Sequence, residues 1–323
     1  MVKAVRVHKV GGPEVMTFED VEVDQPGPGQ ALIRHGAIGL NFIDTYFRTG
    51  LYATKPPFTL GMEGAGTIEA LGEGVTHLNV GDRVAYTGLL GSYSEKRVAP
   101  ADKLVKIPKG ISDEVAAGMM LKGLTAHYLL HKTYRVGPGD TILIHAAAGG
   151  VGLIVCQWAK FLGATVIGTV GSPAKAKLAK EHGCDHAIDY TKEDFVARVK
   201  EITGGNGVPV VYDSVGKDTF DKSLDCLRPL GLMVSFGNAS GAPAPVDVLK
   251  LMQKGSLFLT RPTLQHYIAT RDLLEEAAQE LFKAVRTGVV AIKVDQKYAL
   301  KDAAQSHRDL ESRKTTGSTV LIP

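Results

Sequence analysis

Cysteine is scarce in this sequence, and its placement excludes two kinds of site. The three cysteines are Cys156, Cys184 and Cys226, and no two of them have the short spacing of a metal-binding pair. A disulfide framework and a zinc site built from cysteine are therefore both excluded. Reduced thiols of this kind are typical of a cytosol-like compartment, and we expect a cytoplasmic protein.

Charge of one sign and long apolar runs are missing as well. The formal net charge is +3 and no basic cluster accompanies it, so we expect neither nucleic acid nor an acidic membrane surface as a partner. No stretch reaches the ~20 apolar residues of a membrane span. The first residues, MVKAVRVHKVGG, lack the apolar core of a signal peptide.

Glycine, by contrast, is plentiful, with 37 residues among 323. Glycine together with many Val, Ile and Ala residues is typical of α/β domains, in which helices pack close to strands and the backbone approaches ligands. The hydrophobic share of 44% and the charged share of 22% are ordinary for a globular enzyme. A chain of this length suggests two domains, each with its own core.

The hydrophobic pattern changes twice along the chain. The first third has short strands broken by Gly/Pro turns, which predicts a β-rich domain, followed by a helix start at 112–114 and a helix from about 121 to 134. Strands and helices then alternate, which predicts a doubly wound parallel sheet. The segments after Arg261-Pro262, which include an amphipathic helix expected at 272–287, fit better as a return to the first domain. The strands expected in the sheet are 141–146, 165–169, 186–188, 208–213, 230–236 and 256–260.

The strongest local signal is the segment TILIHAAAGGVGLIVCQWAKFLG. A strand that ends at Ala146 is followed by Ala147-x-Gly149-x-x-Gly152 and then by a helix. In a dinucleotide-binding turn the first position makes the tight turn, the second lets the backbone approach the pyrophosphate, and the third permits close helix–strand contact. The helix N-terminus offers free N–H groups and a partial positive charge. The segment predicts a dinucleotide site, with alanine in place of the first glycine.

The stretch 168–175 bears on the choice between NAD and NADP. An NAD site usually places an acid about 20 residues after the loop, at the end of the second strand. Here Ser172 and Lys175 offer a hydroxyl and a cation and no acid is present, so we expect NADPH. Ser172 also fits the N-cap of the next helix with Pro173 at its first position, and we expect it to serve in both ways. Lys175 alone fits an exposed helix lysine equally well.

Several motifs in order along the chain resemble one enzyme family. They are Asn41-Phe42-Ile43-Asp44 with Tyr46, Gly61-Met62-Glu63-Gly64, Gly81-Asp82-Arg83-Val84, the run from Gly139 to Lys160, and Glu311-Ser312-Arg313 before a Gly-Ser turn. They resemble the zinc-free quinone oxidoreductases of the medium-chain dehydrogenase/reductase superfamily, which include zeta-crystallin. The resemblance implies an α/β protein with a GroES-like catalytic domain of 1–125 and 264–323. It also implies a Rossmann NADPH-binding domain of 126–263, a cleft between the domains, and a homodimer.

The zinc-dependent relatives of this family differ at two motifs. They carry Cys where this chain has Asn41 and His where it has Met62, so the resemblance implies that no metal is bound. Glu63 remains, but one carboxylate does not make a zinc site, which needs three or four ligands. We therefore interpret Glu63 as a buried, hydrogen-bonded structural acid.

The resemblance also implies roles for individual residues. Asn41, Tyr46 and Tyr52 are expected to face the nicotinamide or the substrate, and Thr125 to lie beside the nicotinamide ring. The loop residues Ala147, Gly149, Gly150, Val151 and Gly152 are expected to hold the pyrophosphate. The other expected cofactor contacts are Ser172, Lys175, Tyr190 and Arg313 around the adenosine phosphate, and Asn238, Arg261 and Thr263 at the border of the cofactor.

The strand expected at 256–260 carries Leu257, Phe258 and Leu259 and is predicted to form an apolar edge of the sheet. Such an edge is usually paired or covered. Together with the resemblance, it predicts a two-fold dimer joined edge to edge.

The predicted activity is hydride transfer from NADPH to a small quinone, an acceptor electrophilic enough to need no Lewis acid. An enone or enoyl reductase of the same superfamily is an alternative that the sequence does not separate from it. A third alternative is a non-enzymatic NADPH-loaded structural or RNA-binding protein. No aromatic side chains are interleaved with a basic run, as single-strand readers need, so the sequence gives RNA contact no direct support.

Overall fold

The computed structural model describes all 323 residues, and by its internal contacts the chain divides into two compact units. The first unit contains 1–124, 268–286 and 292–323, and the second contains 125–267 and 287–291. The sequence prediction places Thr125, 264–267 and 287–291 with the first domain, whereas these residues belong to the second unit. No helix of either unit combines the length and the hydropathy that crossing a bilayer requires.

The first unit is built mainly from strands, which confirms the β-rich prediction. Its strands are β1 (Val2–Val7), β2 (Met16–Val21), β3 (Gln30–Leu40), β4 (Phe58–Thr59), β5 (Glu63–Leu71), β6 (Arg83–Thr87), β7 (Lys96–Pro100), β8 (Val105–Lys106), β15 (Val294–Ala299) and β16 (Ser318–Ile322). A seven-stranded sheet has the order β15-β16-β3-β5-β6-β8, with β7 also paired to β3, and a smaller sheet has the order β2-β1-β4. Because β16 pairs antiparallel with β3, the end of the chain completes a sheet made largely of N-terminal residues.

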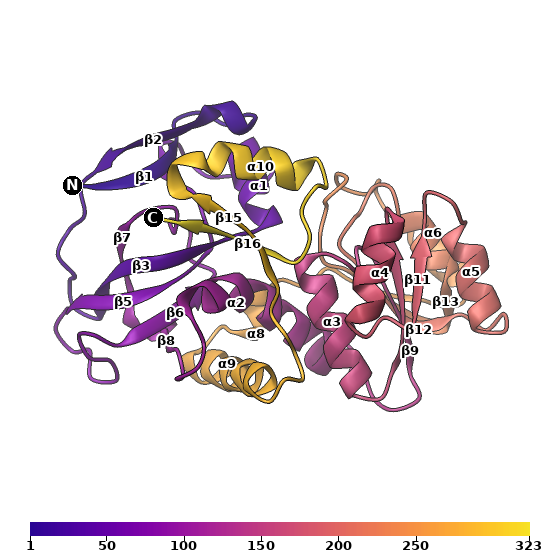
Figure 1. Ribbon diagram of the computed structural model, residues 1–323. Coiled ribbons are helices and arrows are strands. Elements are labelled where there is room, and N and C mark those ends of the chain that lie inside the picture. The colour runs from indigo at the N-terminus through magenta and orange to yellow at the C-terminus, as the bar shows by residue number, and fades with distance from the viewer. The chain divides into compact units, whose positions relative to one another are not determined.

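Helices from distant parts of the sequence join this unit. They are α1 (Phe42–Thr49), most of α2 (Asp113–Tyr128), α9 (Arg271–Arg286) and α10 (Ala303–Glu311), as Figure 1 shows. Helix α9 is amphipathic because Leu274, Ala278, Leu281 and Phe282 recur at helical spacing and are all buried. The helix expected at 272–287 is thus confirmed.

Helix α1 lies where the sequence prediction contained no helix. Its boundary signals are nevertheless present, because the Asp44 carboxylate accepts a hydrogen bond from the Asn41 N–H at 2.9 Å, across the N-cap. Gly50 ends the helix with a left-handed φ of 83°. The segment between them is rich in aromatic and β-branched residues, which favour strands, and this content hid the capping signals.

The helix start expected at 112–114 is confirmed, whereas the bounds expected for a helix from about 121 to 134 are wrong. Helix α2 begins at Asp113, where Ser112 accepts hydrogen bonds from Val115 N and Ala116 N, and it ends at Tyr128. A π-helical turn, Leu129–Thr133, follows it. The helix is apolar and buried nearly all round, so its sequence has no amphipathic period from which to read its ends.

The second unit is a doubly wound parallel sheet, as predicted. Its strands are β9 (Thr141–Ile144), β10 (Thr165–Val170), β11 (His186–Asp189), β12 (Val208–Asp213), β13 (Leu227–Ser235) and β14 (Phe258–Thr260). Every pairing is parallel, and the strand order is β11-β10-β9-β12-β13-β14. The main crossover helices are α3 (Gly150–Phe161), α4 (Pro173–Glu181), α5 (Phe195–Ile202) and α6 (Phe220–Asp225), shown in Figure 1.

The buried and exposed parts of this sheet follow its topology. Strand β12 is central, and all of its residues are buried. Strand β14 is an edge, where Phe258 and Leu259 are 60% and 36% exposed, which confirms the predicted apolar edge. The short helices α7 (Val248–Gln253) and α8 (Leu264–Tyr267) were not predicted, because neither has a buried face that would produce a periodic signal.

Candidate cofactor and substrate sites

In the second unit, the residues predicted to bind the cofactor follow the ends of neighbouring strands. Because the carboxyl ends of parallel strands meet at one edge of a sheet, these segments share that edge. The strand order reverses between β9 and β12, and a reversal of this kind is where open α/β sheets bind ligands. The segments are Ala147–Gly152 after β9, Ser172 and Lys175 after β10, Tyr190 after β11, Asn238 after β13, and Arg261 and Thr263 after β14.

The loop after β9 forms a compact turn against the start of α3. Gly149 is the N-cap of α3, and its N–H donates to Ala146 O at 2.9 Å. A Cβ on Gly152 would lie 2.3 Å from Ala146 O and 2.7 Å from Ala147 Cα, so only glycine fits there. The first-turn N–H groups of α3 have no acceptor within the helix. The turn therefore provides the free amides and the close backbone approach that a pyrophosphate needs.

The alanine at the first position of the glycine pattern is accommodated by a second glycine. Ala147 is fully buried, and its N–H donates to Thr169 O at 3.0 Å. On the neighbouring strand, a Cβ on Gly168 would lie 2.5 Å from Ala147 Cβ and 2.8 Å from Cys184 Sγ. Gly168 therefore leaves the space that the Ala147 methyl group occupies, and the departure from the strict pattern does not disturb the turn.

The predicted adenosine-phosphate residues of this unit gather at the end of β10. Ser172 is the N-cap of α4 and its Oγ accepts a hydrogen bond from Lys175 N, which confirms the capping role, and Pro173 stands at the first helical position. The Tyr190 hydroxyl lies 2.6 Å from the position that a Cβ on Gly171 would take. Tyr190 therefore folds back over the loop that ends at Ser172, just before the first turn of α4, which carries Lys175.

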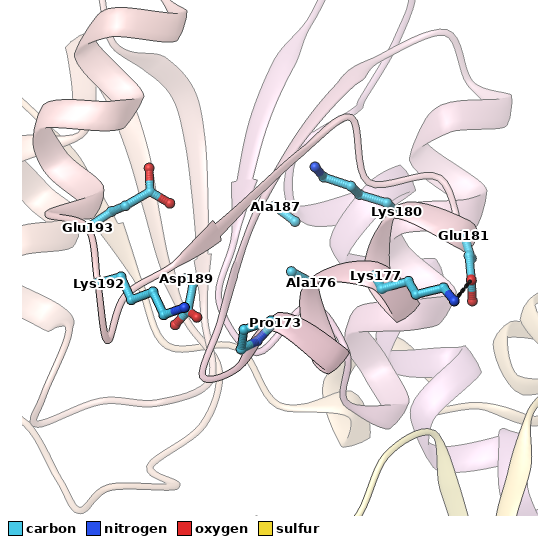
Figure 2. A pocket seen from close by; sticks show the side chains of 9 residues that line it. All are labelled: Pro173, Ala176, Lys177, Lys180, Glu181, Ala187, Asp189, Lys192 and Glu193. Atoms are coloured by element: carbon cyan, nitrogen blue, oxygen red, sulfur yellow. Dashed lines mark ion pairs between the residues drawn. The ribbon is translucent and has the colours of Figure 1, made fainter.

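A hollow of about 520 Å³ opens beside this loop, between α4 and the segment after β11 (Figure 2). Its lining carries both signs of charge, with Lys177 paired to Glu181 at 3.9 Å. Asp189 also lines it, but Asp189 Oδ1 accepts from the N–H and the hydroxyl of Thr191. One oxygen of the acid nearest to Tyr190 in sequence is thus engaged in its own turn, whereas its Oδ2 is buried without a hydrogen-bond partner.

A buried polar network lies under the carboxyl edge of the sheet. His145, at the end of β9 and 1% exposed, contacts Thr169 Oγ1 through Nδ1 at 2.8 Å and Ser223 Oγ through Nε2 at 2.9 Å. Ser223 in turn donates to Asp213 at 2.9 Å. Burial lowers the pKa of His145, which favours the neutral ring. The network ties β9, β10, β12 and α6 together beneath the loops, and sequence inspection did not find it.

In the first unit, the predicted substrate residues surround one short helix. Asn41 caps α1, Tyr46 lies within it, and Tyr52 follows its end. The rings of Tyr46 and Tyr52 meet edge to face with centroids 5.3 Å apart, and Tyr52 N donates to Tyr46 O at 3.0 Å. Asn41 and Tyr46 are only 4% and 8% exposed. The structure thus collects these side chains on one element of the unit.

Glu63 is buried and hydrogen-bonded, as the sequence analysis interpreted it. Its side chain is fully buried, and it accepts hydrogen bonds from Leu121 N and Asn41 Nδ2, each at 2.7 Å. Lys122 Nζ lies 3.5 Å from Glu63 Oε2 and donates to Leu40 O at 3.1 Å. Burial raises the pKa of Glu63, whereas the charge of Lys122 and the hydrogen bond from Asn41 act against that rise.

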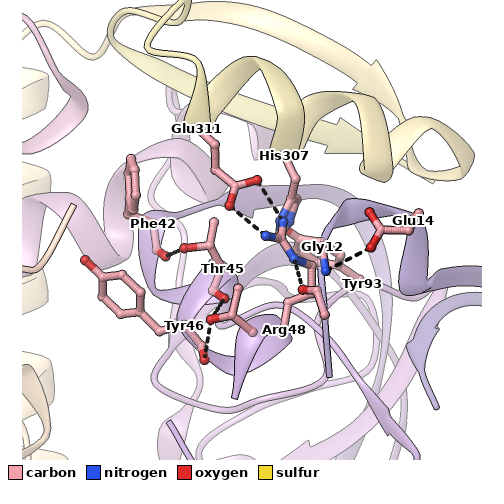
Figure 3. Close-up of polar contacts among 11 residues, drawn as sticks. Gly12, Glu14, Phe42, Thr45, Tyr46, Arg48, Tyr93, His307 and Glu311 are labelled. Atoms are coloured by element: carbon pink, nitrogen blue, oxygen red, sulfur yellow. Dashed lines mark hydrogen bonds and ion pairs between the residues drawn. The ribbon is translucent and has the colours of Figure 1, made fainter. Parts of the chain in front are cut away.

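A second buried network joins α1 to α10 (Figure 3). Arg48, 1% exposed, donates to both carboxylate oxygens of Glu311 at 2.6 and 3.1 Å and to His307 Nδ1 at 2.9 Å. Tyr93 completes the network by donating to Asp44 at 3.0 Å and contacting His307 Nε2 at 3.1 Å. Burial raises the pKa of Asp44 to about 7. The Tyr46 side chain points away from the network (Figure 3), so the network anchors one side of α1 and leaves Tyr46 on another.

Thr125 and Arg313 are the remaining residues predicted to contact the cofactor. Thr125 is buried in α2, and by its contacts it belongs to the second unit, whereas Arg313 belongs to the first and adopts a left-handed φ of 59°. Their predicted places beside the nicotinamide and the adenosine phosphate stay predictions. No His, Cys, Asp and Glu side chains are grouped so as to hold a metal ion.

Comparison with known proteins adds the family. The alcohol dehydrogenase GroES-like domain matches 27–109, and the zinc-binding dehydrogenase domain matches 150–284. A quinone oxidoreductase of Pseudomonas aeruginosa is 55% identical over 325 residues, which cover 100% of both chains. A 2-haloacrylate reductase of Burkholderia sp is 51% identical, over 100% of this chain and 99% of that protein. The crystal structure of Escherichia coli quinone oxidoreductase complexed with NADPH matches with a TM-score of 0.98 at 52% identity, over 99% of this chain and 100% of that one.

Proposed function

The chain belongs to the quinone oxidoreductase family of the medium-chain dehydrogenase/reductase superfamily, and we propose that it reduces small quinones with NADPH and without zinc. The observation that carries the proposal is the acid-free end of β10, where Ser172, Lys175 and Tyr190 gather beside the glycine turn of α3. NADPH, when bound, supplies the hydride. The protein's own task is to hold the reactants, exclude water and stabilise the negative charge that develops on the acceptor oxygen.

The second unit offers groups that fit each part of NADPH. The first-turn amides of α3, those of Gly150 and Val151 among them, suit the pyrophosphate. The hydroxyls of Ser172 and Tyr190 and the ammonium of Lys175 suit the 2′-phosphate. A phosphate accepts hydrogen bonds from such donors, whereas a carboxylate at this place would repel it. We assign Arg313 to the same phosphate. We assign Thr125, Asn238, Arg261 and Thr263 to the remaining border of the cofactor.

The first unit supplies the groups that meet the quinone. We assign Tyr46 as a hydrogen-bond donor to the acceptor oxygen, with Tyr52 packed against its ring. In this proposal Tyr46 acts by hydrogen bonding and solvent delivers the final proton. Removing one oxyanion donor typically costs ~10²-fold or more in rate. A quinone needs less help, so we expect a loss of about tenfold, or ~1.4 kcal/mol, for Tyr46→Phe.

The test is NADPH oxidation by the purified chain with a panel of quinones, run beside enones and 2-haloacrylates. The 2-haloacrylate reductase relative makes reduction of a conjugated C=C bond the second candidate. Rapid turnover of quinones with slow turnover of the alkenes supports the first activity, and the reverse order supports the second. Absence of any turnover with bound NADPH would favour a non-enzymatic role. Activity that disappears when stoichiometric zinc is chelated would contradict the zinc-free mechanism.

Two further properties belong to this proposal. We infer a homodimer joined through β14, because Phe258 and Leu259 on that edge and Val248, Leu249 and Met252 on α7 are exposed apolar side chains. A monomer in light scattering at micromolar concentration would contradict this assembly. We also infer a reducing, cytoplasmic setting, because Cys156, Cys184 and Cys226 are all free and buried.

A further inference from the structure

The dinucleotide turn begins at a residue whose backbone is strained. Ala146 adopts a left-handed φ of 55°, a conformation that glycine takes freely and that brings the Cβ of any other residue too close to the following carbonyl oxygen. The residue is exposed, so packing of its methyl group does not stabilise this conformation. Strained backbone of this kind persists only where the surrounding structure holds it. The contacts that hold Ala146 therefore come from its neighbours.

The left-handed conformation of Ala146 aims its carbonyl oxygen at the start of α3. Ala146 O accepts a hydrogen bond from Gly149 N, the N-cap of α3, at 2.9 Å. A Cβ on Gly152 would lie 2.3 Å from the same oxygen, so the first turn of the helix packs directly on this carbonyl group. The conformation of Ala146 consequently fixes where the first-turn amides of α3 lie relative to the end of β9.

Hydrogen bonds hold the chain on both sides of Ala146. Before it, His145 contacts Thr169 Oγ1 through Nδ1 at 2.8 Å and Ser223 Oγ through Nε2 at 2.9 Å. After it, Ala147 N donates to Thr169 O at 3.0 Å. Thr169 therefore holds the strained residue from both sides, through its side chain before the residue and through its backbone after it.

The hydrogen bonds of the His145 ring run in one direction. Burial lowers the pKa of His145, so the ring is neutral and carries one N–H donor and one acceptor. Ser223 donates to the buried carboxylate of Asp213 at 2.9 Å, and this charged acceptor takes the hydroxyl hydrogen. The Ser223 oxygen then accepts from His145 Nε2, and His145 Nδ1 accepts from the Thr169 hydroxyl. The four side chains form one chain of hydrogen bonds that ends on a carboxylate.

We propose that His145 is a positioning residue of the cofactor site: anchored to Thr169 and Ser223, it holds Ala146 in the left-handed conformation and so preforms the turn that receives the pyrophosphate. This inference rests on the proposed function, which places the pyrophosphate at that turn. His145 is 1% exposed, so it acts through the backbone of Ala146 and not by contact with the cofactor. A histidine that only filled the core would contribute to stability and not to the shape of the turn.

The substitution Ala146→Gly separates these two roles, because glycine adopts the left-handed conformation without support. In the parent, His145→Leu should raise the NADPH dissociation constant about 5- to 30-fold, the range that corresponds to the strain of a left-handed residue other than glycine. In the Ala146→Gly background, the same substitution should raise it less than about threefold. An equal effect of His145→Leu in the two backgrounds would overturn the proposal.

Two further variants complete this titration. Val211→Ala, in the buried core of the same sheet, is the control for general destabilisation: it should lower the melting temperature and leave the NADPH dissociation constant within about twofold of the parent. Thr169→Val serves where His145→Leu does not fold, because it removes only the hydroxyl and keeps the carbonyl that Ala147 N meets. We expect a rise of about three- to tenfold, the range of one lost hydrogen bond. The same rise in the Ala146→Gly background would overturn the proposal.

Hydrogen exchange in the protein free of cofactor tests the turn itself. The Gly149 N–H donates to Ala146 O, so its exchange with solvent, followed by ¹⁵N NMR, reports on the conformation of the turn. We expect this exchange to be about tenfold faster in His145→Leu than in the parent, and the difference to fall below about threefold in the Ala146→Gly background. Unchanged exchange in His145→Leu would overturn the proposal. Failure of the parent to reduce quinones would instead reject the proposed function and leave the exchange results standing.

Discussion

The candidate cofactor site of the second unit is made largely of backbone, whereas the candidate substrate site of the first unit rests on buried charged side chains. At the edge of the parallel sheet, Gly152 makes room for the turn of α3, and Tyr190, whose hydroxyl lies over Gly171 after β10, is 41% exposed. Around α1, Glu63 and Arg48 are 0% and 1% exposed, and each engages several hydrogen-bond partners.

The difference lies in what each site has to recognise. A pyrophosphate is bound by amide groups that every residue carries, so its site needs a backbone path and tolerates many side chains. A neutral acceptor has to be met by particular donors at particular angles, so its site needs side chains that do not move. Buried ion pairs and hydrogen bonds supply that rigidity. Removing one partner of such a pair causes a large loss of stability, because the other partner stays buried without its contact.

The largest effect expected from this contrast is at Gly152. A Cβ would lie 2.3 Å from Ala146 O, so Gly152→Val forces the turn and α3 apart. We expect NADPH affinity to fall by ~100-fold or more, well over 2 kcal/mol, measured by fluorescence titration. Gly137→Val is the matched control, because a Cβ on Gly137 meets no atom within 4 Å and Gly137 precedes β9, at the end of that strand opposite to the turn. Equal losses in the two variants would show that close approach at Gly152 is not what shapes the site.

The next effect compares an ion pair with a buried arginine in the first unit with an exposed pair of the second. Arg48 is 1% exposed and donates to His307 and to Glu311, whose side chain is 35% exposed, so Arg48→Met should cost about 1.5–3 kcal/mol of unfolding free energy through the lost charged hydrogen bonds. Lys160 pairs with Asp185 at 2.5 Å, but its side chain is 54% exposed. Lys160→Met should therefore cost under about 1 kcal/mol. Urea unfolding of both variants measures these costs. Similar losses of unfolding free energy at the two sites would contradict the contrast in rigidity.

The same contrast explains how much of the molecule could be predicted from the sequence. The dinucleotide turn was found because Ala147-x-Gly149-x-x-Gly152 is a local pattern whose spacing carries its meaning. Glu63 was interpreted correctly as a buried acid. Its partners Asn41 and Lys122 were not predicted, because they lie 22 and 59 positions away in the sequence. Side-chain contacts over such separations leave no trace in a single sequence.

The errors at helices α1 and α2 have a related reason. Helix α1 has a cap at each end, but its aromatic and β-branched interior favours a strand, and its packing against α10 decides in favour of the helix. Helix α2 lacks an amphipathic period because it is buried on nearly all sides. The Arg48–Glu311 pair that joins α1 to α10 spans 263 positions, so no local signal announced it.

A pH titration measures the effect of one buried carboxyl group of the first unit, that of Asp44. Burial raises the pKa of Asp44 from 3.8 to about 7, so the folded chain keeps a proton that the unfolded chain releases. The stability that this protonation contributes is complete below pH ~4 and is lost as the pH rises toward 7. Asp44→Asn removes the titration while keeping an oxygen for Asn41 N and the Tyr93 hydroxyl. We expect the variant to gain on the parent by about 1 kcal/mol per pH unit between pH 5 and 7.

Urea unfolding from pH 5 to 8 measures that gain. The other charged or titratable groups that face Asp44 are carried by several elements, and they are unchanged in the variant: Arg48, Glu63, Tyr93, Lys122 and His307. The pKa of His307 is lowered by burial to about 3, so this ring stays neutral throughout the range. Asp24→Asn, in an exposed loop, is the control. A parallel pH dependence in the parent and in Asp44→Asn would contradict the assignment.

The smallest effect separates charge from capping at the edge of the second unit. Ser172 caps α4 by accepting from Lys175 N, and aspartate and asparagine cap helices about as well as serine. Ser172→Asp and Ser172→Asn should therefore unfold at nearly the parent's temperature. Only the aspartate places a negative charge where the 2′-phosphate is assigned, so it should weaken NADPH about tenfold, or ~1.4 kcal/mol, and leave NADH within about twofold. Titration of both variants with both cofactors makes the distinction. Equal weakening of NADPH by the two substitutions would mean that shape and not charge matters at Ser172, and no weakening by either would leave Ser172 as a helix cap alone.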